Sequence, residues 1–174
     1  ERGITIKMQP VRMSYNFGSK LYTLNLIDTP GHIDFSYEVS RSLTAVEGAV
    51  LLVDATQGIQ AQTIGNLELA KKQGLVIIPV INKIDLNISK IEDSTKELVN
   101  LLQVKDEEII KISAKEGINI ELVLKAVIEK IPAPGGRGSP SITTGRPAPQ
   151  SSNQLSLRAL VFDSKYDPHK GVIA

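Results

Sequence analysis

The sequence predicts an α/β fold, a mostly parallel sheet with helices on both of its faces. The middle of the chain alternates continuous apolar runs, at residues 49–54 and 75–81, with segments of helical apolar period. Unbroken apolar runs are typical of strands covered on both faces, and their alternation with helices indicates parallel crossovers. The 174 residues are 41% hydrophobic, enough for one domain with a proper core and some additional chain.

The N-terminal part is expected to form a hairpin. Apolar residues alternate with polar ones over residues 4–17, which is typical of a half-buried strand. Residues 18–20 supply a turn, and residues 21–27 are interpreted as the antiparallel return strand. Pro10 marks either an edge position or a break in the register of this hairpin.

The remaining elements follow in order. A helix is expected over residues 35–46, with Gly48 placed to end it. Strands are then expected at residues 49–54, 75–81 and 109–112, and helices at residues 62–73, at residues 89–102 and from Asn119, as the capping residue, to Ile131.

The C-terminal part has a different composition. Residues 132–154 are rich in Pro, Gly, Ser and Thr, so we interpret them as a flexible linker. Residues 155–163 resume as an alternating strand, and a turn then leads to a second strand at Val172. The predicted domains are residues 1–131, the linker 132–154, and residues 155–174 as the first hairpin of an all-β domain.

Composition excludes several kinds of site. The chain has no cysteine, which excludes disulfides and thiolate metal sites, and its two histidines, His32 and His169, are too few for a His-rich zinc site. The net charge of +1 argues neither for nor against nucleic acid. No apolar run approaches a membrane span of about 18–20 residues. Both ends, at Glu1 and at residues 171–174, lie within patterned segments, so we expect truncations.

Three polar clusters follow predicted strands directly. They occupy residues 28–32, 82–85 and 113–115. Ligands of parallel α/β sheets bind beyond the carboxyl ends of the strands. We therefore expect the three clusters to lie on one rim and to form one site.

The first cluster suits phosphate chemistry. Asp28 can hold a metal ion through water, and the Gly31 N–H can approach an anion closely after the turn at Thr29 and Pro30. His32 adds a polar side chain, which completes what phosphoryl transfer to water needs. The alternative is a capped turn, with Asp28 or Thr29 as the cap.

The second cluster, Asn82-Lys83-Ile84-Asp85, suits a guanine base. Guanine presents two adjacent donors, which one carboxylate, that of Asp85, matches in a fork, whereas adenine would leave the charge unpaired. Asn82 can donate to the ring N7 or brace the loop. The aliphatic stem of Lys83 can lie across the base, with Ile84 as the spacer. The alternative is a polar loop after a strand.

The third cluster would close the same pocket. The Ala114 N–H can donate to the guanine carbonyl, Lys115 can cover the second face of the base, and Ser113 begins the cluster. Thr5 fits as a magnesium ligand through its hydroxyl oxygen. Without the other motifs, the alternative is that Thr5 is an ordinary β-branched strand residue. The pattern Gly-x-x-x-x-Gly-Lys-Ser/Thr of a phosphate loop occurs nowhere in the chain.

These motifs resemble the second to fifth signature motifs of translational GTPases: Arg2-Gly3-Ile4-Thr5, residues 28–32, residues 82–85 and residues 113–115. Among these enzymes the chain is most similar to the LepA family, also called elongation factor 4, at residues 35–43, 79–86 and 160–167. The resemblance covers nearly the whole chain except the linker. It implies a P-loop-GTPase-like sheet that lacks its first strand, phosphate loop and first helix, followed by the start of a β-barrel domain.

The resemblance implies a ribosome-associated GTPase with GTP as substrate and Mg²⁺ as cofactor. Thr5 and Asp28 would bind magnesium, Asp28 through water. The Gly31 N–H would contact the γ-phosphate, and His32 would position the attacking water once the ribosome orders it. Ile4 would form one half of a hydrophobic gate that holds His32 away until then. The remaining nucleotide-binding residues would be Thr29, Pro30, Asn82, Lys83, Ile84, Asp85, Ser113, Ala114 and Lys115.

The resemblance also implies partners and a place in the cell. We expect a cytoplasmic monomer that binds ribosomal RNA and proteins in complexes containing tRNA, and that does not bind DNA. Some family members are described as peripheral to the inner face of the membrane, so a peripheral association there, or a location in an organelle, stays open. The alternatives are a piece of elongation factor G or BipA, or a ribosome-binding remnant that does not hydrolyse GTP. We expect this chain alone to be inactive.

Overall fold

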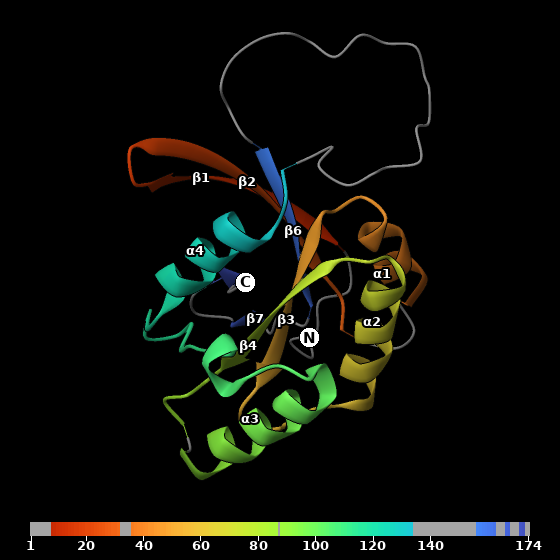
Figure 1. Cartoon of the computed structure of the whole chain (residues 1–174), viewed down its shortest axis with the longest axis vertical. Coiled ribbons are helices and arrows are strands. Elements are labelled where there is room, and N and C mark those ends of the chain that lie inside the picture. Colours follow the sequence, from red (N-terminus) through yellow and green to blue (C-terminus); the bar gives the residue numbers. More distant parts are fainter. Residues whose placement is uncertain are drawn as a thin grey trace, which may run out of the picture.

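The computed structural model describes residues 8–31, 36–86, 88–133, 156–162, 166–167 and 171–172. In chain order the elements are β1 (Gln9–Phe17), β2 (Lys20–Thr29), α1 (Ser36–Leu43), β3 (Gly48–Asp54), α2 (Ala61–Lys72), β4 (Val76–Asn82), α3 (Ile88–Leu102), a 3-10 turn η2 (Asp106–Glu108), β5 (Ile110–Lys111), α4 (Ile120–Lys130), β6 (Ser156–Phe162), β7 (Tyr166–Asp167) and β8 (Gly171–Val172). Six strands form one sheet in the order β1-β2-β6-β3-β4-β5 (Figure 1).

The sheet is parallel except for the N-terminal hairpin. β1 pairs antiparallel with β2, as expected from the alternation, and β2, β6, β3, β4 and β5 are joined by parallel pairings. Pro10 pairs with Ile27 without a break in register, and β1 forms the edge of the sheet. Because an edge strand has one unpaired side, proline is tolerated there.

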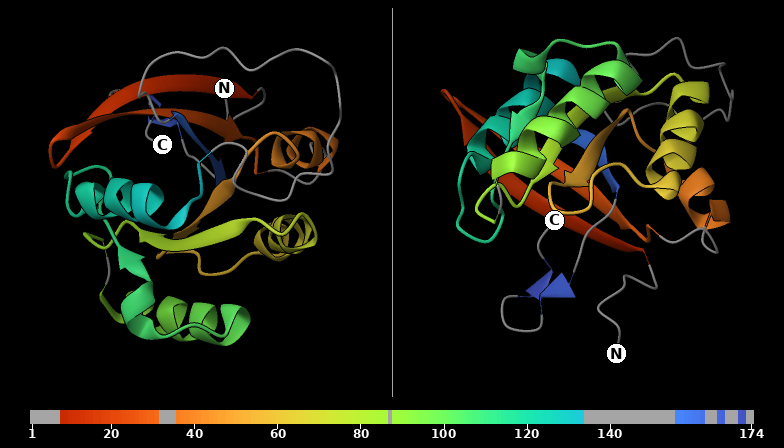
Figure 2. Two further views of the ribbon diagram at one scale, coloured as in Figure 1. Left: turned by 45° about the horizontal axis from the view of Figure 1, so that its top comes forward. Right: turned by 90° about the horizontal axis from the view of Figure 1, so that it is seen from below.

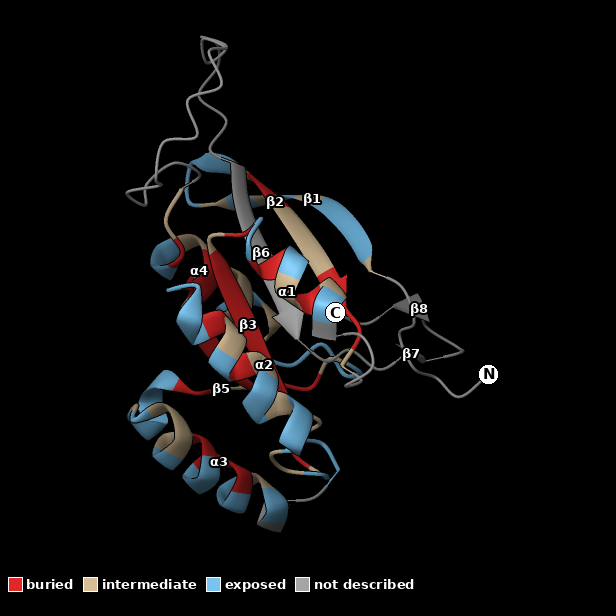
Figure 3. Cartoon of the chain, turned by 90° about the vertical axis from the view of Figure 1, so that its right-hand side faces the viewer, coloured by how far each residue is buried: buried red, intermediate tan, exposed pale blue. Residues whose placement is uncertain are grey.

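The core has two layers, one on each face of the sheet. β3 alternates between them: Leu51 and Val53 face the layer packed by α1, α2 and α3, whereas Val50 and Leu52 face the layer packed by α4. Figure 3 shows β3 buried along its length, with α2 and α3 exposing their outer sides. Burial on both faces explains why the sequence of β3 is apolar without alternation.

The first helix is shorter than expected, and the role predicted for Gly48 is wrong. α1 ends at Leu43, a turn follows, and Gly48 is the first residue of β3. A Cβ atom at Gly48 would lie 2.6 Å from both Cγ1 and Cδ1 of Ile131. Glycine is therefore needed here for the close approach of the end of α4 to β3, not as the stop of a helix.

Asn119 occupies the N-cap position of α4, but its side chain makes no capping hydrogen bond. Its φ of 61° places the backbone in the left-handed region, and its Nδ2 donates to the Lys111 carbonyl at 2.8 Å. The predicted capping role is therefore wrong in its mechanism. The side chain ties the start of α4 back to β5 instead.

The predicted pairing of residues 155–163 with the strand at Val172 is also wrong. β6 lies between β2 and β3 and is parallel to both, with Leu26 opposite Ala159 and Ala49 opposite Leu160. Figure 2 shows β6 within the main sheet and the small β7–β8 pair to one side of it. The free edges of β2 and β3 leave backbone groups that need partners, and an apolar strand satisfies both edges.

Residues 134–155, which make up most of the predicted linker, lie outside the described residues. Among the helices that the structure describes, none is long and apolar enough to cross a membrane.

Candidate functional site

The polar clusters lie on one rim, as expected. β2, β4 and β5 run in the same direction, and residues 28–31, 82–85 and 113–115 occur at or just beyond their carboxyl ends. The carboxyl end of β3, at Asp54, lies on the same rim beside β4. The sheet therefore brings side chains from four strands to one edge.

The cluster at the end of β2 is only partly described. Asp28 and Thr29 are the last residues of β2 and are 4% and 0% exposed, Pro30 is buried, and Gly31 is half-buried. His32, Ile4 and Thr5 lie outside the described residues. Of the two expected magnesium ligands, Asp28 is thus the one that lies within the described residues.

Asp28 offers a carboxylate at the end of a strand, and carboxylate oxygen is a type of ligand that Mg²⁺ takes in proteins. In the described part of the chain, no three His, Asp or Glu side chains converge to form a protein cage for a metal. Mg²⁺ is commonly held by one or two protein oxygens together with waters and phosphate oxygens. A single carboxylate at a strand end is compatible with that mode.

Asn82 braces the rim between two loops. Its Oδ1 accepts from the Lys83 N–H at 2.8 Å and from the Ala114 N–H at 3.0 Å. Of the two roles considered for Asn82, the structure shows the bracing one. The Ala114 N–H, expected to donate to the guanine carbonyl, donates to Asn82 Oδ1 in this structure.

Ser113 holds Asp85 in place. The Ser113 hydroxyl, which is fully buried, donates to Asp85 Oδ1 at 2.6 Å and accepts from the Glu116 N–H at 3.2 Å. The hydrogen bond from Ser113 lowers the pKa of Asp85 below its ordinary value of 3.8, and the charges of Lys115 and Lys83 act in the same direction. Asp85 is therefore an exposed, ionised carboxylate whose orientation is fixed from beneath.

Lys115 extends from the same loop. Its Nζ lies 3.6 Å from Glu116 Oε1, and both side chains are more than half exposed. Exposed ion pairs of this kind are weak. The side chain can reorient over a ligand at low cost, which is compatible with covering one face of a base.

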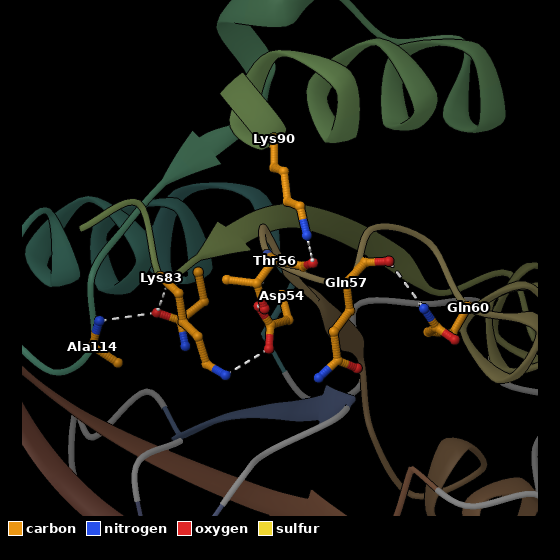
Figure 4. A network of polar contacts seen from close by, with 8 residues as sticks. Asp54, Thr56, Gln57, Gln60, Lys83, Lys90 and Ala114 are labelled. Carbon is orange, nitrogen blue, oxygen red and sulfur yellow. Dashed lines mark hydrogen bonds and ion pairs between the residues drawn. The ribbon is translucent and has the colours of Figure 1, made fainter. Parts of the chain in front are cut away.

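Sequence reasoning missed the contribution of Asp54 and Thr56. Asp54 Oδ2 lies 2.6 Å from Lys83 Nζ, and Asp54 Oδ1 accepts from the Thr56 N–H and hydroxyl at 2.8 and 2.7 Å (Figure 4). Burial acts to raise the pKa of Asp54, but the hydrogen bonds from Lys83 and Thr56 and the Lys83 charge outweigh it and lower the pKa. The available signal was an acid at the carboxyl end of a strand that neighbours β4.

Comparison with known proteins assigns the chain to a family. Residues 1–133 match the family described as the elongation factor Tu GTP-binding domain. The chain belongs to this family. The matched residues include strands β1 to β5, helices α1 to α4 and the three polar clusters, but not β6.

The resemblance to the LepA family is confirmed within this group. Elongation factor 4 of Rubrobacter xylanophilus is 55% identical over 174 residues, which are 100% of this chain and 26% of that protein. Elongation factor 4 of Chlorobaculum parvum is 53% identical over 175 residues, which cover 100% of this chain and 26% of that protein. The chain thus spans about a quarter of the length of the curated relatives it matches.

Solved structures confirm the fold of the GTP-binding domain. The translation elongation factor SelB of Methanococcus maripaludis, in complex with the GTP analogue GppNHp, superposes with a TM-score of 0.60 at 26% identity, over 71% of this chain and 28% of that chain. A bacterial selenocysteine-specific elongation factor, EF-Sec, gives a TM-score of 0.66 at 31% identity, over 76% of this chain and 24% of that chain.

Proposed function

We propose that the rim formed by Asn82, Lys83, Asp85, Ser113 and Ala114 binds the guanine base of GTP and GDP. The observation that carries the proposal is the exposed Asp85 carboxylate held by buried Ser113 at 2.6 Å. A fixed, ionised carboxylate accepts from both adjacent donors of guanine, N1–H and the exocyclic amino group. Adenine offers no such pair of donors, so the site is selective.

We propose further that the cluster at the end of β2 serves GTP hydrolysis. Asp28 would hold a magnesium ion through water together with Thr5, and the Gly31 N–H would contact the γ-phosphate. His32 would orient the attacking water, and bound Mg²⁺ would supply charge stabilisation for the phosphoryl transfer. The support for this assignment is the position of Asp28, buried at the carboxyl end of a strand on the same rim as Asp85.

The protein would act in translation, as a factor of the elongation factor 4 type. Support comes from relatives that bear this name and match over the whole chain, among them the two described above. We propose that it binds cytoplasmic ribosomes as a monomer and that the ribosome orders His32 for hydrolysis. A peripheral association with a membrane belongs to the same set of proposals.

The domain division is also a proposal. The family match ends at residue 133, close to the expected end of the GTP-binding domain at residue 131. Residues 132–154 would then link this domain to a β-barrel that begins at residue 155. In a complete factor the β6 segment would belong to that barrel, whereas in this chain it pairs with β2 and β3.

The chain by itself is proposed to bind GTP weakly and to hydrolyse it negligibly. Its 174 residues contain no Gly-x-x-x-x-Gly-Lys-Ser/Thr segment. That segment supplies the backbone N–H groups and the lysine that hold the phosphates in P-loop GTPases. The base site would therefore have to hold the nucleotide without its main phosphate contacts.

The test uses a complete factor that contains this sequence. Residues 1–174 replace the matching segment of the Rubrobacter xylanophilus factor, and binding of GDP, ADP and xanthosine diphosphate is measured by fluorescence competition. The chimera is expected to prefer GDP over ADP by about three powers of ten. Asp85→Asn is expected to weaken GDP binding at least about 100-fold and to improve xanthosine diphosphate binding, because an amide can donate to the added carbonyl.

Asp106→Asn is the matched control, since Asp106 is likewise an exposed aspartate but pairs with Lys111, at 2.7 Å, and belongs to none of the three polar clusters. Equal affinity of the chimera for ADP and GDP, or an Asp85→Asn variant that binds GDP normally, would overturn the base assignment. GTP hydrolysis by the isolated chain at the rate of the chimera would overturn the proposal that the chain alone is inactive.

A further inference from the structure

We propose that Asp54 is a positioning residue of the nucleotide site, which acts by fixing the direction of the Lys83 side chain. The inference rests on the proposed function, because it assigns Lys83 to the face of the guanine base. Asp54 belongs to none of the three polar clusters, and it comes from β3, whereas the base-reading residues follow β4 and β5.

The contact between the two side chains is short and sheltered. Lys83 Nζ lies 2.6 Å from Asp54 Oδ2, and the two side chains are 27% and 16% exposed. Ion pairs at this depth are screened less by water and salt than surface pairs. The pair therefore restrains the end of a side chain that is otherwise among the most mobile in proteins.

The other end of Lys83 is restrained as well. Its φ of 67° is unusual for a residue that is not glycine, and its N–H donates to Asn82 Oδ1 at 2.8 Å. Backbone in this region persists where surrounding contacts hold it. With the backbone fixed by Asn82 and the amino group fixed by Asp54, the stem between them has a defined course along the rim (Figure 4).

Asp54 is itself held rigidly enough to act as an anchor. Its Oδ1 accepts two hydrogen bonds from Thr56, and the Ala55 N–H donates to the Asn82 carbonyl at 2.9 Å, which joins the loop after β3 to the end of β4. From α3, Lys90 Nζ donates to the Thr56 carbonyl at 2.8 Å. The carboxylate therefore has a fixed position relative to the residues that read the base.

These contacts assign different tasks to two acids. Asp85 distinguishes guanine from other bases, because it accepts from the exocyclic amino group. Lys83 lies against a ring face that guanine and hypoxanthine share, so its placement affects both bases equally. Loss of Asp54 should therefore weaken binding of GDP and of inosine diphosphate by the same factor and leave their ratio unchanged.

The experiment measures both affinities in the chimera described above. Asp54→Asn keeps the size of the side chain and an acceptor for Thr56 but removes the charge that pairs with Lys83. We expect each dissociation constant to rise about 5- to 30-fold, which corresponds to a lost charge-assisted hydrogen bond of about 1–2 kcal/mol. Combining Asp54→Asn with Lys83→Ala should weaken binding no more than Lys83→Ala alone, since the effect passes through Lys83.

A second readout needs no nucleotide. In the 174-residue chain, the NMR signal of the Lys83 ε-methylene is expected to shift on Asp54→Asn and to stay in place on the control Asp106→Asn. If Asp54→Asn leaves this signal and both affinities at their unsubstituted values, the inference is wrong. It is also wrong if the GDP-to-inosine diphosphate ratio changes, or if the losses from Asp54→Asn and Lys83→Ala add.

Failure of the proposed function has a different signature. In that case the unsubstituted chimera would show no preference for GDP over inosine diphosphate, and Asp85→Asn would have no effect on the ratio. A chimera that prefers GDP while Asp54→Asn behaves like Asp106→Asn would retain the base assignment and overturn the role of Asp54 alone.

Discussion

Gly48→Ala tests the packing that fixes β3, the strand that carries Asp54 to the rim. A methyl group at Gly48 would lie 2.6 Å from Cδ1 and Cγ1 of Ile131 and 3.0 Å from its Cγ2. Ile131 is 3% exposed, so its side chain is enclosed and cannot simply swing into solvent. The added methyl group must therefore displace the end of α4 or force Ile131 out of its rotamer.

The expected cost follows from two opposing effects. Overpacking a close-packed core typically costs about 1–3 kcal/mol. Replacing glycine by alanine where the backbone permits it stabilises a protein by about 0.4–1 kcal/mol, through the unfolded chain. The net destabilisation should be about 0.5–2 kcal/mol, or roughly 1–8 °C in melting temperature for a chain of this length.

Urea and thermal unfolding followed by circular dichroism measure this cost. Ile131→Ala removes the clashing atoms, so in that background Gly48→Ala should become neutral or stabilising. Gly65→Ala, in the middle of α2, is the matched control: a Cβ there meets nothing within 4 Å, so the variant should be more stable. If Gly48→Ala alone stabilises the chain, or if its effect is the same in the Ile131→Ala variant, Ile131 does not exclude a methyl group at position 48.

Two further predictions concern the site and the sheet. The pKa values of Asp54 and Asp85 are both lowered from 3.8, so in acid the unfolded chain binds more protons than the folded chain. The stability that the two carboxylates add at higher pH should therefore be lost as the pH falls below about 4. Urea unfolding from pH 7 to pH 3 should show a smaller acid loss for Asp54→Asn; an unchanged loss contradicts the pKa assignment. In the chain, the double variant Leu26→Cys, Ala159→Cys should form a disulfide on oxidation, since these residues are opposite each other in β2 and β6. The control variant combines Leu26→Cys with Leu160→Cys, one position out of register. Equal crosslinking of the two double variants would contradict the register.

Much of the architecture could be predicted from local sequence. Unbroken apolar runs identify β3 and β4 as strands, because strands buried on both faces have apolar residues at every position. An apolar residue at every third or fourth position identifies α4 as a helix that is buried on one face. The placement of the three clusters at strand ends then led to one rim, since parallel strands end on the same edge of a sheet. The proposal of a guanine base followed from the hydrogen-bonding groups of residues 82–85 and 113–115 taken together.

Local pattern failed where a residue serves a distant neighbour. The sequence predicts Gly48 as the end of a helix, whereas the structure needs a glycine there because Ile131 packs against it. The sequence predicts Asn119 as a capping residue, whereas its side-chain amide donates to the Lys111 carbonyl. Glycine is common after the end of a helix and asparagine at an N-cap, so these local roles explain both residues. The sequence gives no sign that each residue makes a different, long-range contact.

The sequence by itself determined the strand and helix order, the polar rim and the acid suited to guanine, because these depend on periodicity and on the chemistry of single side chains. Tertiary structure alone decided that β6 fills the position between β2 and β3, and that Asp54 pairs with Lys83, which lies 29 positions away. Those outcomes depend on which backbone edges and which charges the fold brings together. Contacts between residues far apart in the chain leave no periodic signal along it.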